Sequence, residues 1–131
     1  MPDKRNVAIF YLEPDFALRE LHKNLVFKGH AAFKEVDNEA DLLALLDSAL
    51  GPAVAIVRPG SLRSETMLSL KFNHPQVCFV ALSADDEKVI RQRHGGTMAD
   101  YSYLPVEACE KLQHYKLTLA QIASDAGIDI S

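Results

Sequence analysis

The chain has 131 residues, the length of one compact domain that buries about two-thirds of its unfolded surface. Hydrophobic residues make up 48% of the sequence and charged residues 24%, which is typical of a globular protein and not of a disordered tail. The formal net charge is -4 with acids and bases interspersed, which excludes the concentrated positive field that direct nucleic-acid binding requires.

Apolar strands and helices alternate in the first third of the chain. Residues 7–12 (VAIFYL) predict a strand buried on both faces, and an apolar period of three to four residues over 14–29 predicts a helix. A second strand is expected over 31–36. Asp37 and Asn38 then offer a cap for a leucine-rich helix.

The same alternation continues to the end of the chain. Residues 53–57 (AVAIV) and 77–82 (VCFVAL) predict two more buried strands, 85–93 a polar helix, and 101–104 a fifth strand. Five strand–helix repeats predict a parallel sheet with helices on both faces and right-handed crossovers. The fold class is therefore α/β, and the expected architecture is a flavodoxin-like, doubly wound (βα)5 sheet with strand order 2-1-3-4-5.

Two of the remaining helices carry further expectations. A short helix between the third and fourth strands is expected to place Met67, Leu68 and Leu70 in the core, and the alternative is that they line a groove. The last helix is expected to open at Pro105, because proline is favoured in a first turn, and to run to about residue 126.

Cysteines, histidines and apolar stretches suggest neither a metal site nor a membrane segment. Cys78 and Cys109 have no zinc or redox spacing and are expected to be buried reduced thiols. The histidines share no metal-ligand spacing, and most are expected at the surface; they are His22, His30, His74, His94 and His114. No apolar stretch reaches the roughly 18 residues of a spanning helix, so a cytoplasmic protein without membrane contact is expected.

The residues that follow the predicted strands carry the functional argument, because an open parallel sheet places its functional crevice beyond the carboxyl ends of its strands. Glu13 follows the first strand, Arg58 the third, Ser83 the fourth and Pro105 the fifth. None of the first three loops has the glycines of a phosphate cradle, and no Walker, G-x-G-x-x-G or G-x-S-x-G motif occurs. We therefore expect neither an enzyme nor a bound cofactor.

The order and spacing of these strand ends resemble the receiver domain of two-component response regulators, of the chemotaxis type, over nearly all of residues 1–131. In that family an acidic pair after the first strand binds magnesium, and an aspartate that ends the third strand accepts phosphate. The resemblance places the acidic pair on Leu12 and Glu13 and the phosphoacceptor on Arg58. One carboxylate is therefore kept, and the nucleophile is replaced by a cation.

The other family positions are partly kept. The resemblance places the switch hydroxyl on Ser83 and the reporter aromatic on Tyr101, and Pro105 keeps the family's proline. Leu104 stands where the family has lysine. The degenerate phosphorylation site thus comprises Leu12, Glu13, Arg58, Ser83, Leu104 and Pro105.

Arg58 decides what this site can do. A guanidinium stays protonated in proteins, so it cannot attack phosphorus, and its charge repels magnesium from Glu13. Phosphotransfer is therefore expected to be absent. We expect either an ion pair between Arg58 and Glu13 that fixes one conformation, or an Arg58 side chain that reaches solvent beside a vestigial pocket.

Each remaining polar or aromatic position has two interpretations. Asp15 is expected in the first turn of a helix, favoured by the helix dipole, instead of acting as a ligand. Ser83 caps the next helix or binds an anion or a partner. Tyr101 and Tyr103 form an interaction face or pack as partly buried aromatics.

The resemblance implies a pseudo-receiver: a non-catalytic signalling module, independent of aspartate phosphorylation, that acts through a protein partner or as a homodimer. The last helix would then couple it to a downstream output domain, for instance in transcription regulation. An alternative is a sensor that binds an anion or small ligand through Arg58 and Ser83. Phosphotransfer through Asp15 or Ser83 is the third hypothesis.

Overall fold

The computed structural model describes residues 7–13, 15–26, 33–49, 51–83, 87–94, 101–105 and 111–130. These residues form one parallel five-stranded sheet with the order β2-β1-β3-β4-β5, which confirms the expected doubly wound, flavodoxin-like architecture. The strands are β1 (Ala8–Leu12), β2 (Phe33–Val36), β3 (Ala53–Val57), β4 (Val77–Ser83) and β5 (Ser102–Pro105).

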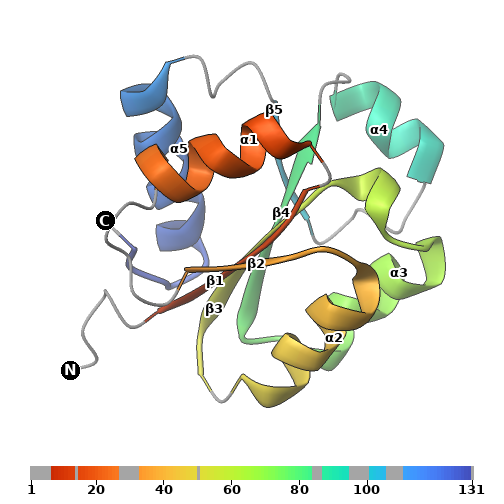
Figure 1. The fold of residues 1–131 in the computed structure, drawn as a ribbon. Coiled ribbons are helices and arrows are strands. Elements are labelled where there is room, and N and C mark those ends of the chain that lie inside the picture. The colour runs from red at the N-terminus through yellow and green to blue at the C-terminus, as the bar shows by residue number, and fades with distance from the viewer. Residues whose placement is uncertain are drawn as a thin grey trace.

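Helices cover both faces of this sheet (Figure 1). The α-helices are α1 (Phe16–Leu21), α2 (Glu39–Ser48), α3 (Ser64–Asn73), α4 (Glu87–His94) and α5 (Leu112–Asp125). Two short helices of other types are the π-helix η2 (His22–Val26) and the 3-10 helix η3 (Pro59–Ser61). Asn38 caps α2, as expected, by accepting a hydrogen bond from the backbone N–H of Asp41 at 2.9 Å.

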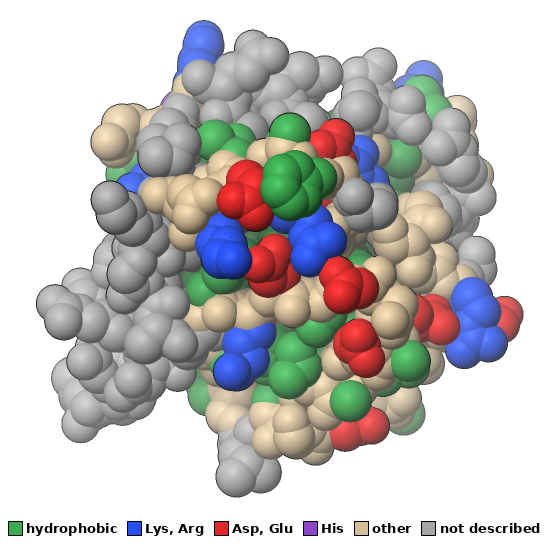
Figure 2. All heavy atoms as spheres, in the orientation of Figure 1, with side chains coloured by type: hydrophobic (Ala, Val, Ile, Leu, Met, Phe, Trp, Pro, Cys, Tyr) green, Lys and Arg blue, Asp and Glu red, His purple; other side chains and the backbone are tan. Residues whose placement is uncertain are grey.

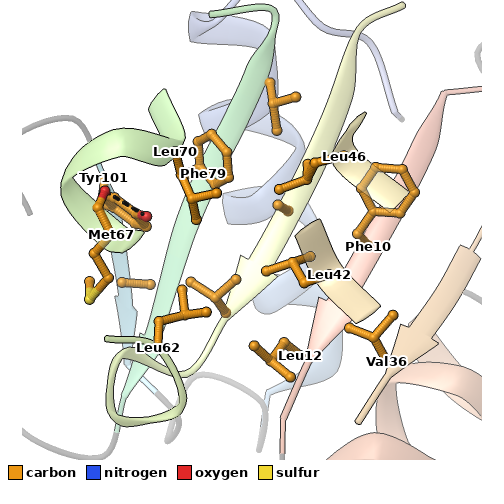
Figure 3. Packing of buried hydrophobic residues seen from close by; sticks show 14 of the residues in the cluster. Phe10, Leu12, Val36, Leu42, Leu46, Leu62, Met67, Leu70, Phe79 and Tyr101 are labelled. Atoms are coloured by element: carbon orange, nitrogen blue, oxygen red, sulfur yellow. Dashed lines mark hydrogen bonds between the residues drawn. The ribbon is translucent and has the colours of Figure 1, made fainter. Parts of the chain in front are cut away.

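One apolar cluster lies on each face of the sheet, because successive side chains of a strand point to opposite sides. On one face Phe10 and Leu12 of β1 pack with residues of α2, α3 and α4. Figure 3 shows this cluster, with Tyr101 directed toward the backbone of Met67. On the other face Ile9 and Tyr11 pack with residues of α1 and α5. Every residue of β3 and β4 is buried, so neither face of these central strands meets water.

The last helix begins later than its sequence pattern predicts. Pro105 is the final residue of β5, in register with Ser83, and α5 begins at Leu112, while residues 106–110 lie outside the described part. The expected helix start at Pro105 is therefore wrong. β5 is an edge strand of the described sheet, and an edge strand tolerates a residue that cannot donate a backbone hydrogen bond.

The apolar positions of two helices are only partly buried. Met67 and Leu70 lie in the core as expected, but Leu68 is exposed, so its expected core position is wrong. In α5 the buried stripe consists of Tyr115, Leu119 and Ala123, which recur every four residues.

The edge strand β2 carries a network of ion pairs with α1 and η2. Arg19 pairs through Nε with Glu35 at 3.2 Å and through an Nη atom with Asp37 at 2.9 Å, and Lys23 pairs with Glu35 at 3.3 Å. In Figure 2 acidic and basic side chains alternate across the face of the molecule that is turned toward the viewer. Paired charges therefore connect β2 and Asp37, which follows it, with α1 and η2.

Substitutions in α5 test whether its buried stripe holds the helix to the sheet. Leu119 is 1% exposed and Leu117 is 70% exposed. We expect Leu119→Ala to lower the free energy of unfolding by about 2–5 kcal/mol, because it leaves a cavity, and Leu117→Ala to change it by less than about 0.5 kcal/mol. Urea denaturation at one pH measures both values, and equal losses in the two variants would contradict this packing.

Candidate functional site

Glu13 and Arg58 lie side by side because β1 and β3 are neighbouring parallel strands that end at the same edge of the sheet. Leu12 is in register with Val57, and the backbone N–H of Arg58 donates to the carbonyl of Leu12 at 3.0 Å, which extends the ladder by one step. The side chains that follow the two strands thus start from adjacent backbone positions.

The two side chains form a bidentate ion pair. Arg58 donates from Nε to Oε2 of Glu13 at 2.7 Å and from Nη2 to Oε1 at 2.8 Å. The side chain of Glu13 is 1% exposed and that of Arg58 is 22% exposed. This is the geometry in which a guanidinium and a carboxylate bind most strongly. The ion pair expected from the sequence is present, and Arg58 does not extend into solvent.

The carboxylate of Glu13 is also bound by the backbone of the next helix. The N–H of Asp15 donates to Oε1 of Glu13 at 3.1 Å. Asp15 is itself the N-cap of α1, because its Oδ1 accepts hydrogen bonds from the N–H groups of Ala17 at 2.9 Å and Leu18 at 3.3 Å. Asp15 therefore stabilises the helix start as its N-cap, one position before the first turn in which it is expected from the sequence, while Glu13 receives three hydrogen bonds.

The electrostatics of the site favour the charged form of the Arg58 guanidinium. Hydrogen bonding and charge from Glu13 raise the pKa of Arg58 above its ordinary value, although burial opposes this rise. A permanent cation therefore fills the place where a hard divalent metal would need a second carboxylate. Three hydrogen bonds already engage the two oxygens of Glu13, so a metal would have to compete with the guanidinium of Arg58 for this carboxylate.

The two leucines of the expected site, Leu12 and Leu104, do not lie together at this pair. Leu12 packs into the cluster below α2 and α3, while Leu104 packs into the cluster below α1 and α5. The two leucines therefore lie on opposite faces of the sheet. Ser83 is buried at the end of β4 beside Pro105 in the sheet register, and residues 84–86, which would show whether it caps α4, lie outside the described part.

The two tyrosines that are expected to form an interaction face differ in how deeply they are buried. Tyr101 is buried, its hydroxyl donates to the carbonyl of Met67 at 3.2 Å, and its ring centroid lies 5.4 Å from that of Phe79. Tyr101 therefore offers no surface to a partner, and the packing interpretation holds for it. Tyr103 is half-buried against the same cluster.

His22 is a polar core residue that the sequence interpretation missed. It is fully buried at the junction of α1 and η2, although most histidines were expected at the surface. Its Nδ1 lies 2.7 Å from the carbonyl of Leu18, and its Nε2 contacts the hydroxyl of Tyr115 in α5. The ring stacks on Tyr11 of β1 with a centroid distance of 4.3 Å. Periodicity of apolar residues carries no signal for such a position, since histidine is counted as polar.

The neutral form of His22 fits these contacts. A carbonyl can only accept, so Nδ1 carries the proton, and Nε2 then accepts from the hydroxyl of Tyr115. Burial lowers the pKa of His22 to about 4, against a smaller opposing effect of the hydrogen bond to Leu18. By contrast, the described side chain of His114 is exposed. The side chain of His74 is buried, and its Nε2 lies 3.5 Å from Oδ1 of Asp47.

Other functional features are few within the part of the chain that the structure describes. Cys78 is buried as expected, and burial raises the pKa of its thiol, whereas Cys109 lies outside that part. No cluster of three or more metal-ligating side chains occurs among the described residues. Nor does any helix within the described ranges have the length and apolar character needed to cross a membrane.

Comparison with known proteins leaves the site to be interpreted from its geometry. No protein-family model matches the chain, and no curated protein or solved structure matches it.

Breaking the ion pair from its two sides is expected to have unequal effects. Arg58→Met leaves a buried, unpaired Glu13 carboxylate and should lower the free energy of unfolding by about 3–5 kcal/mol at neutral pH. Glu13→Gln should cost less, because Arg58 is partly exposed and its guanidinium can turn to water. The double variant should recover much of the loss. Urea denaturation of the wild type, the two single variants and the double variant measures these losses. A loss below about 0.5 kcal/mol in Arg58→Met would show that the pair contributes no more to stability than an exposed salt bridge.

Proposed function

We propose that this chain is a non-enzymatic signalling module, similar to a receiver domain, that works through protein–protein contact and without aspartate phosphorylation. The observation that carries the proposal is the bidentate pair between Glu13 and Arg58. It lies at the carboxyl edge of the sheet, where open α/β sheets bind ligands, and it fills that edge with the chain's own charges. Such a domain keeps its fold and loses the means to bind metal or accept phosphate.

The alternative of an anion or small-ligand sensor has less support. It needs a guanidinium that can turn toward a ligand, whereas Arg58 donates from Nε and Nη2 to a buried carboxylate. An anion would have to compete with a charge already held in the stronger, bidentate geometry. Phosphotransfer through Asp15 is also disfavoured, since its carboxylate caps α1.

Exposed apolar side chains on α3 support protein contact as the mode of action. Phe72 is 86% exposed and Leu68 is 62% exposed, and a spacing of four residues puts them on one face of the helix. Single exposed apolar residues are ordinary, but neighbouring ones mark contact surfaces more often. Self-association is the form of protein contact that can be tested with this chain alone. The proposed setting is the cytoplasm, with a partner or a further domain delivering an output such as transcription regulation.

Titration with magnesium and beryllofluoride tests the loss of phosphorylation chemistry. We expect no saturable amide shifts around Glu13, Arg58, Ser83 and Tyr101 in the wild-type chain. Arg58→Asp should gain saturable magnesium shifts, because it sets two carboxylates side by side. Arg58→Asn is the matched control, which removes the cation without adding a carboxylate and should stay silent. Specific saturation by the wild type would contradict the proposal and favour the sensor.

Sedimentation velocity over a range of concentrations tests self-association. We expect a concentration-dependent dimer for the wild type, because pairing would remove Leu68 and Phe72 from water. The double variant Leu68→Ser/Phe72→Ser should remain monomeric. Leu117→Ser, which changes an equally exposed leucine on α5, should behave like the wild type. A wild-type chain that is monomeric at all concentrations would exclude self-association as the mode of contact.

A further inference from the structure

Ionisable side chains connect α2 with α3 at both ends of the two helices. At the helix starts, Arg63 donates from Nε to Oε2 of Glu39 at 2.8 Å. At the helix ends, Nε2 of His74 faces Oδ1 of Asp47 at 3.5 Å. A hollow of about 430 Å³ is lined by residues of both helices, with Asp47 and His74 among them. Dissolved ions can therefore reach the pair at the helix ends.

The contact between Asp47 and His74 is wide for this protein. Within the described residues, the ion pairs that join other separate segments are 2.7–3.3 Å long. An N–H···O hydrogen bond spans about 2.7–3.2 Å, so a separation of 3.5 Å is longer than a normal one. The separation is close to that of two ligands on one zinc ion, because bonds of about 2.0–2.2 Å at a tetrahedral angle put the two ligand atoms roughly 3.3–3.5 Å apart.

Burial restrains the imidazole, while the carboxylate stays accessible. The side chain of His74 is 10% exposed and that of Asp47 is 74% exposed. A neutral imidazole offers one lone pair and a carboxylate offers two oxygens, and this combination of nitrogen and oxygen donors is typical of zinc ligands. His74 is therefore held in place before an ion arrives, and Asp47 can meet the ion from the solvent side.

The helix ends beside the pair favour a positive charge. Asp47 lies in the last turn of α2, which contains no basic residue, and His74 is the C-cap of α3. Helix C-termini carry partial negative charge, so a cation is stabilised there and a carboxylate is not. Lys71, the basic residue in the last turn of α3, donates to the carbonyls of Pro75 and Val77. A cation bound between Asp47 and His74 would compensate the charge of Asp47.

We propose that Asp47 and His74 form a two-ligand site for zinc or a similar divalent transition-metal ion, which ties the end of α2 to the end of α3. Two protein ligands leave the other coordination positions to water, so the ion exchanges with solvent. The ligands come from separate helices, so no short spacing in the sequence indicates the site. This inference stands apart from the proposed signalling role, because it involves neither Glu13 nor Arg58.

Calorimetric titration of the whole chain with zinc chloride, together with amide chemical shifts, tests the site. We expect one equivalent of zinc to bind, with saturable shifts at Asp47 and His74 and none at Glu13 and Arg58. Zinc above its dissociation constant should also raise the urea midpoint, because it binds the folded chain. Magnesium at the same concentration should cause neither effect, since it prefers oxygen ligands. Failure of millimolar zinc to saturate the chain would overturn the proposal.

Three variants assign the binding to these two side chains. Asp47→Asn keeps the size of an exposed side chain and should weaken zinc binding at least about 10-fold. His74→Gln should have the same effect, and Asp47→Asn still decides the question if the buried substitution does not fold. His114→Gln removes an exposed histidine of α5 and should bind zinc like the wild type. Full affinity in Asp47→Asn, or loss of binding in His114→Gln, would indicate an adventitious ion only and overturn the site.

Discussion

The burial of β3 and β4 on both faces is the constraint on which the rest of the structure depends. Backbone groups of these strands are paired in the ladder, and their side chains have to be covered by helices above and below the sheet. Charged side chains can then reach these two central strands only beyond their ends. Glu13 follows β1 directly at such an end, and because it is almost fully removed from water, its charge has to be matched from within the chain.

Arg58, which follows the neighbouring strand β3, supplies the matching positive charge. The desolvation of both charges makes such a pair a weak source of stability compared with apolar packing, while an unpaired member is costly. The pair therefore selects one arrangement of the carboxyl edge more than it strengthens the fold. A guanidinium bound at two nitrogens also leaves little freedom for the loop that carries it, and Arg58 is followed at once by the short helix η3.

Much of this could be predicted from the sequence, since strands buried on both faces appear as continuous apolar runs. The third strand was predicted residue for residue as Ala53–Val57, and the pairing of Glu13 with Arg58 follows from neighbouring strands that end together. Local patterns failed where tertiary context decides. Pro105 fits both a first helical turn and an edge strand, and His22 is polar by type but buried by its contact with an element that lies far away in the chain.

We expect the ion pairs beside β2 to hinder misassembly of the protein. An edge strand presents unpaired N–H and C=O groups that a strand from another molecule can use to extend the sheet, which leads to aggregation. A foreign strand approaching β2 would have to strip water from Arg19, Lys23, Glu35 and Asp37 and disturb their pairing. Charges that contribute little to folding can thus keep separate copies of the sheet from joining edge to edge, even at high protein concentration.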